Sequence, residues 1–257
     1  MEIITVTNQK GGVGKTTTAQ HLAIGLKNRG YRVLLVDSDQ QGNLTYTLNC
    51  NYNASIYDVI NGTISANDAI FHSSQCDIIA GDIRLSRAEK ELVDTGREYF
   101  LRNALAPIKD EYDYIIIDTP PTLGILTINA LTCSDSVIIP AQADIFSLQG
   151  FGQLNNLINQ VKLYTNPNLK IKGVLLTKYN DRTILNRQLR KKVEEISSKI
   201  DTSSGLHHST SRPSVCTPWA KRQSQRSPFF HTDVLLLDCR KIRQAPAVPH
   251  PSVPSGG

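Results

Sequence analysis

The sequence lacks the features of a membrane-spanning, exported or disulfide-stabilised protein. No run within its 257 residues approaches the ~18 apolar residues that a membrane-spanning helix needs. The amino terminus leads straight into a predicted strand with no export signal, so we expect a cytoplasmic protein. There is no C-x-x-C pair, and an odd number of widely spaced cysteines indicates reduced thiols rather than a disulfide framework. The cysteines are Cys50, Cys76, Cys133, Cys216 and Cys239.

An excess of positive charge is also missing from most of the chain. Basic and acidic residues balance over residues 1–201, and the net charge of +5 arises after that point, from seven basic and two acidic residues. The same segment holds seven of the twelve prolines and four of the six histidines. Sequence of this kind buries too little apolar surface to offset its ordering entropy. We therefore expect a folded domain over 1–201 and an atypical, largely disordered basic tail over 202–257.

The most informative segment present is residues 8–18, a glycine-rich stretch with two lysines between an apolar run and a helical pattern. A strand, a glycine turn and a helix in that order aim backbone N–H groups and the helix dipole at one point, where a polyphosphate fits. The alternative interpretation is a glycine turn with two solvated lysines. The predicted nucleotide-binding residues here are Lys10, Gly11, Gly12, Val13, Gly14, Lys15, Thr16 and Thr17.

Carboxylates end two further apolar runs. Residues 31–37 lead into Asp37 and Asp39, and residues 114–117 lead into Asp118, which two prolines follow. In a parallel sheet the carboxyl ends of the strands line the ligand crevice. The second run resembles a Walker B strand, and this resemblance implies that Asp118 holds Mg²⁺ together with Thr16. Capping of the following turn or helix is the alternative for each of the three aspartates.

The remaining pattern alternates strands and helices. Short apolar runs at 77–80, 136–140 and 173–177 predict buried strands, while 17–29 and 84–101 carry helical patterns, the second as one helix or a pair. This alternation predicts an α/β fold, a doubly wound, mostly parallel sheet with helices on both faces.

The segment Lys10-Gly-Gly-Val-Gly-Lys-Thr16 resembles the deviant Walker A loop of the ParA/MinD branch of P-loop ATPases, and the chain resembles the ParA-type (Soj-like) partition ATPases over about residues 1–200. The usual first glycine of the motif is replaced by Gln9. The resemblance implies that Lys10 reaches the partner's nucleotide across a dimer interface and that Asp39 orients the attacking water. Lys10, Lys15 and Asp39 are then the predicted catalytic residues, and ATP and Mg²⁺ the cofactors.

The family also places base contacts near residues 173–182. Thr177 is therefore a candidate for the adenine pocket, and a plain strand-end residue is the equal alternative. The implied activity is slow ATP hydrolysis conditional on homodimerisation and stimulated by a ParB-like centromere-binding partner. The implied role is plasmid or chromosome partitioning on non-specific DNA, with the ATP-bound protein associated with the nucleoid.

A predicted helix over about 183–200 carries the basic residues Arg187, Arg190 and Lys191 on one face by i, i+3, i+4 spacing. That face would contact DNA phosphates without reading sequence. The alternative is a solvated face balanced by Glu194 and Glu195.

The tail departs from the family, whose members continue with a strand, a loop over the base and a closing amphipathic helix. Either a reading-frame disturbance near residue 202 or a divergent tail explains the break. The missing amphipathic helix argues against a membrane-bound relative. The open alternatives are a nucleotide-binding but hydrolytically inert or unstable remnant, a relative that positions a non-DNA cargo, and a protein whose basic tail itself binds DNA.

Overall fold

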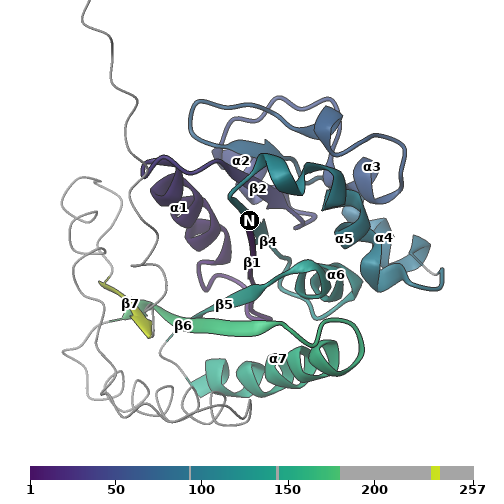
Figure 1. The fold of residues 1–257 in the computed structure, drawn as a ribbon. Helices are drawn as coiled ribbons and strands as arrows, with labels where there is room; N and C mark the ends of the chain where they lie inside the picture. The colour runs from purple at the N-terminus through teal and green to yellow at the C-terminus, as the bar shows by residue number, and fades with distance from the viewer. Residues whose placement is uncertain (93, 143–144, 180–232, 238–257) are drawn as a thin grey trace, which may run out of the picture.

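A seven-stranded sheet lies at the centre of the computed structural model, which describes residues 1–92, 94–142, 145–179 and 233–237 (Figure 1). The strand order is β3-β2-β4-β1-β5-β6-β7. Six neighbouring strands run parallel, and β7 pairs antiparallel with β6. The strands are β1 (Glu2–Val6), β2 (Val33–Asp37), β3 (Asp77–Ile79), β4 (Tyr114–Asp118), β5 (Ser136–Gln142), β6 (Lys170–Tyr179) and β7 (Asp233–Leu237).

Helices cover both faces of this sheet. Figure 1 shows α1 on one side and α4, α5 and α6 on the other, with α7 along β5 and β6. The α-helices are α1 (Lys15–Lys27), α2 (Asn43–Thr47), α3 (Ile56–Ile60), α4 (Leu85–Glu91), α5 (Phe100–Leu105), α6 (Ile125–Cys133) and α7 (Ile145–Tyr164). Short 3₁₀ turns lie at Asn67–Ala69, Arg97–Tyr99 and Ala106–Glu111. The predicted doubly wound, mostly parallel α/β fold is confirmed.

The central strands are mainly apolar because both of their faces are buried. In β4, Ile115 and Ile117 pack into the core beneath α3 to α6, whereas Ile116 between them packs into the core beneath α1 and α2. Consecutive strand residues point to opposite faces, so a strand covered on both sides needs a continuous apolar run. Burial on both faces explains why Ile115, Ile116 and Ile117 follow one another in β4 with no polar residue between them.

The structure moves several predicted boundaries. Helix α1 begins at Lys15, two residues before the predicted start, because Gly14 at φ +91° takes the N-cap position. Strand β2 begins at Val33 rather than residue 31, since the Arg32 N–H donates to the side chain of Asp113 instead of a strand neighbour. The pattern at 84–101 is divided where Gly96 takes a φ of +82°, which an α-helix does not accommodate.

The segment after residue 201 is described only at β7, which coincides with its one apolar run. The predicted helix at 183–200, with Arg187, Arg190 and Lys191, lies outside the described residues. In the described part of the chain, no helix is both long and apolar enough to cross a membrane.

Candidate nucleotide-binding site

The loop between β1 and α1 has the backbone of a phosphate-binding loop. Gly12 and Gly14 take φ values of +70° and +91°, in the left-handed region that glycine adopts without steric cost. The second of these turns the chain into α1, whose first intrahelical bond runs from the Thr18 N–H to the Gly14 carbonyl at 2.9 Å. The unpaired amides of the first turn and the positive end of the helix dipole therefore face the loop.

Asn8 anchors the start of this loop. Its side-chain Nδ2 donates to the Pro140 carbonyl at 2.6 Å, and its Oδ1 accepts the Lys10 N–H at 3.0 Å. The neighbouring strand β5 thus fixes the point at which the chain leaves β1. This anchoring role of Asn8 was not predicted from the sequence, although the position of Asn8 directly before the two-lysine loop is consistent with it.

Lys15 lies inside the site with its side chain largely enclosed. Only 7% of the residue is exposed, and its Nζ donates to the Lys10 carbonyl at 3.2 Å. Burial lowers the pKa of Lys15, while the nearby Asp118 and Asp39 carboxylates act in the opposite direction. The structure therefore brings these three predicted residues into one buried electrostatic cluster at the carboxyl ends of β1, β2 and β4.

Asp118 is the least satisfied group of that cluster. Both of its carboxylate oxygens are buried, and neither has a hydrogen-bond partner among the described residues. Burial raises the pKa of Asp118 to about 8, with Asp37 and Asp39 adding to the effect. The Thr16 hydroxyl is near enough to lower this pKa, but it makes no hydrogen bond of normal geometry to either oxygen. Asp118 is therefore a buried carboxylate without a hydrogen-bond partner in the described part of the chain.

A buried carboxylate without a partner requires an explanation, and a hard cation supplies one. Within the described residues, no group of three or more His, Cys, Asp or Glu side chains is arranged to hold a metal. Mg²⁺ does not need such a cage, because it binds through one or two protein oxygens together with substrate phosphates and water. The donor set of Asp118 and Thr16 beside a phosphate loop fits that requirement.

Asp37 holds the loop after β2 through the hydrogen bonds that its carboxylate accepts. Its Oδ2 accepts the backbone N–H and the hydroxyl of Thr45 at 2.9 and 2.8 Å, and its Oδ1 accepts the Asp39 N–H at 3.2 Å. Burial raises the pKa of Asp37 to about 6, and these hydrogen bonds act against the rise. The capping interpretation is confirmed for Asp37, which orients the backbone that carries Asp39.

Asp39 accepts a hydrogen bond within its own turn and also belongs to the buried cluster with Lys15 and Asp118. Its Oδ1 accepts the Gln41 N–H at 3.0 Å, and the residue is 5% exposed. The preceding Ser38 hydroxyl donates to the Asp118 carbonyl at 2.6 Å, which ties this loop to the end of β4. Asp39 is therefore both a turn residue and a neighbour of Lys15.

Thr177 lies at the end of β6, and its hydroxyl donates to the Val13 carbonyl at 2.8 Å. The structure thus places it against the phosphate-binding loop. Its register partner on β5, Gln142, donates to the Gly12 carbonyl at 2.9 Å. Gln142 was missed by sequence analysis, because strand register, which the sequence does not show, brings it beside Thr177.

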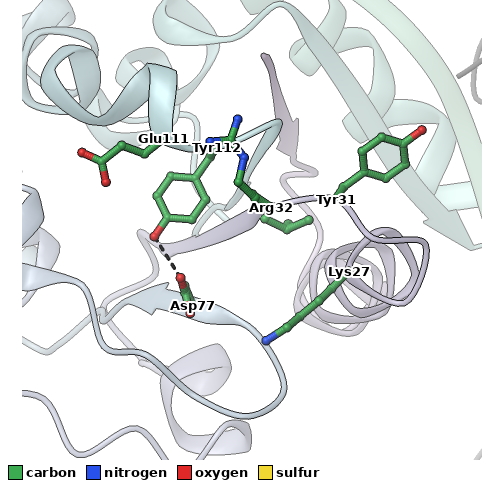
Figure 2. Close-up of a pocket in the computed structure, with 7 residues that line it drawn as sticks. Lys27, Tyr31, Arg32, Asp77, Glu111 and Tyr112 are labelled. Atoms are coloured by element: carbon green, nitrogen blue, oxygen red, sulfur yellow. Dashed lines mark hydrogen bonds between the residues drawn. The ribbon is translucent and has the colours of Figure 1, made fainter. Parts of the chain in front are cut away.

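A pocket of about 310 Å³ lies at the opposite edge of the sheet, at the amino ends of β2 and β3 (Figure 2). Several of its polar side chains contact neighbouring residues. The Tyr112 hydroxyl donates to Asp77 at 3.0 Å, and Arg32 pairs with Asp113 at 3.0 Å. This pocket is separate from the nucleotide site. Its lining residues are Lys27, Tyr31, Arg32, Val33, Asp77, Glu111 and Tyr112.

The glycine-rich loop, the enclosed lysine and the carboxylates at the strand ends define a nucleotide-binding protein of the P-loop class. Comparison with known proteins leads to the same class. The family described as "AAA domain" matches residues 1–171. The sporulation initiation inhibitor protein Soj of Bacillus subtilis is 46% identical over 200 residues, which cover 76% of this chain and 79% of Soj.

The chromosome partitioning protein ParA of Myxococcus xanthus is 43% identical over 201 residues, 76% of this chain and 70% of that protein. Among solved structures, cobyrinic acid a,c-diamide synthase from Mycobacterium smegmatis with a bound ATP analog and magnesium has a TM-score of 0.73. It is 38% identical and covers 76% of this chain and 82% of its own. The chain belongs to the ParA/Soj family of P-loop ATPases.

Proposed function

We propose that this protein is a ParA-type ATPase in which ATP binding drives homodimerisation and hydrolysis releases the dimer, and that the switch partitions a plasmid or chromosome. The observation that carries the proposal is the buried cluster of Lys15, Asp39 and Asp118 beside a loop with a second lysine, Lys10. One structural neighbour bears the name of a synthase, but its 38% identity is lower than the 46% to Soj over the same share of the chain.

Phosphoryl transfer to water requires charge neutralisation, alignment and a group that orients the nucleophile. The loop amides and Lys15 bind the phosphates, and Asp39 accepts a hydrogen bond from the attacking water. Lys10 of a second copy supplies the further positive charge. Because Lys15 is enclosed and already held by the loop, its ammonium reaches the phosphates with little reorganisation.

Asp118 and Thr16 are the residues that would hold Mg²⁺ with the nucleotide, and the ion would neutralise developing negative charge on the phosphates. Without a bound cation, burial raises the pKa of Asp118 to about 8 and so favours its protonated form. Binding of a cation therefore displaces a proton from this carboxyl.

The proposed partners follow from the family. They are a second copy of the chain, non-specific DNA and a ParB-like centromere-binding protein that stimulates slow hydrolysis. We place the protein in the cytoplasm, on the nucleoid when ATP is bound. We also propose residues 1–201 as the ATPase domain and Arg187, Arg190 and Lys191 as DNA-contacting residues.

Hydrolysis measured against protein concentration tests the switch. The specific rate should rise with concentration, because a lysine acting across an interface needs the dimer. Lys10→Ala should abolish that rise, and the exposed Lys109 provides the matched control, Lys109→Ala, which should behave as wild type. Asp39→Ala should retain ATP binding and lose turnover. Normal hydrolysis by Lys10→Ala would refute the trans-lysine mechanism.

A further inference from the structure

Two side chains near the carboxyl ends of adjacent strands donate hydrogen bonds to consecutive backbone carbonyls of the phosphate-binding loop. Gln142 ends β5, and Thr177 is its register partner on β6. The Gln142 Nε2 donates to the Gly12 carbonyl at 2.9 Å, and the Thr177 hydroxyl donates to the Val13 carbonyl at 2.8 Å. The same hydroxyl lies 3.3 Å from the Ala141 carbonyl, so the Thr177 oxygen contacts both β5 and the loop.

These contacts determine where two amide donors point. A peptide unit is planar with its C=O and N–H directed oppositely, so fixing the Gly12 carbonyl fixes the Val13 N–H, and fixing the Val13 carbonyl fixes the Gly14 N–H. Glycine on either side of Val13 makes both peptide units easy to rotate. An unrestrained rotation would turn a carbonyl dipole toward a bound phosphate, where it repels the anion.

We propose that Gln142 and Thr177 are positioning residues that hold the Gly12 and Val13 carbonyls outward and thereby direct the Val13 and Gly14 amides at the nucleotide's phosphates. This inference rests on the proposed nucleotide binding and assigns Thr177 to the loop rather than to the base. The Thr177 methyl packs near Gly14, since a Cβ on that glycine would lie 3.6 Å from it. Thr177→Val therefore removes the hydroxyl and keeps the packing.

The test is calorimetric titration of the full chain with two probes, Mg²⁺-ADP and Mg²⁺-pyrophosphate. Thr177→Val and Gln142→Met should each weaken both probes by about three- to tenfold, the loss expected for one neutral hydrogen bond. Thr177→Ser should restore binding to within about twofold, because it returns the donor. The pyrophosphate arm isolates the loop, since that probe has no base.

Thr132→Val is the matched control. Its hydroxyl bonds the Thr165 hydroxyl at 2.9 Å at the far end of α6, so the variant loses one comparable hydrogen bond away from the loop. Its affinity for both probes should equal that of wild type, while thermal unfolding verifies that every variant is folded.

Three results would overturn the inference. They are unchanged affinity in both Thr177→Val and Gln142→Met, no rescue by Thr177→Ser, and weakened ADP binding with pyrophosphate unaffected, which would mean a contact with the base. A wild-type chain that binds neither probe would instead refute the proposed nucleotide-binding function itself.

Discussion

Gly81 is the position at which a single added methyl group should disturb the site most. It follows β3, and a Cβ built there would lie 2.5 Å from the Asp37 carbonyl oxygen, 2.9 Å from the Asp37 Cγ and 3.0 Å from the Asp39 carbonyl oxygen. Carbon–oxygen contacts are normally about 3.3 Å or longer, so the loop carrying Asp39 must move. The Gly81 N–H also donates to the Thr45 hydroxyl at 2.9 Å, and that bond would be strained as well.

Gly81→Ala should therefore lower the free energy of unfolding by about 3 kcal/mol, from overpacking of about 2 kcal/mol and a weakened buried hydrogen bond of about 1 kcal/mol. For a domain of this size the thermal midpoint should fall by about 6–12 °C. ATP hydrolysis measured well below the midpoint should fall too, because Asp39 is displaced.

Gly152→Ala is the matched control. Gly152 is exposed in α7, and a Cβ there meets nothing within 4 Å. This change should raise stability by about 0.5–1 kcal/mol, the cost of glycine in a helix. If Gly81→Ala unfolds at the wild-type temperature with wild-type turnover, the described contact between the loops after β2 and β3 is wrong.

Substitutions at three further positions test the cluster and the loop beside it. The folded pKa of Asp118, about 8, exceeds the unfolded value of about 4, so the folded state binds more protons between these values and stability falls as the pH rises through that window. Asp118→Asn should therefore raise the thermal midpoint relative to wild type more at pH 8 than at pH 5, and equal shifts would contradict the buried-carboxyl account. Thr45→Val should cost about 1–3 kcal/mol in chemical denaturation because it removes the hydroxyl that donates to Asp37 and accepts from the Gly81 N–H, and Thr45→Ser should recover most of it. Lys15→Ala should lose Mg²⁺-ADP binding in calorimetry, and retained affinity would remove this lysine from the phosphate site.

Local sequence determined much of the fold and the candidate site. The run ending at Asp118 predicted β4 with its observed bounds because a strand buried on both faces is a nearly continuous apolar run. The phosphate-binding loop was equally visible, since glycines with positive φ and the following helix are encoded within a few residues.

Features set by contacts distant in sequence were not predictable. The roles of Gln142 and Thr177 depend on the register of β5 against β6, and that of Gly81 depends on how closely β3 approaches β2. That Asp37 holds the loop after β2 could not be decided from a D-x-D pattern, because this role depends on the hydrogen bonds from Thr45. The domain boundary near residue 201 stays a prediction.

The most direct test of the ATP switch is fluorescence anisotropy of a labelled non-specific DNA duplex titrated with the purified chain. The titration is run with ATP, with ADP and without nucleotide, at two salt concentrations. The account predicts binding only with ATP, weakened at the higher salt because phosphate contacts release counterions. Equal binding in all three nucleotide conditions would place the affinity in the basic tail, and it would contradict an ATP-dependent partition switch.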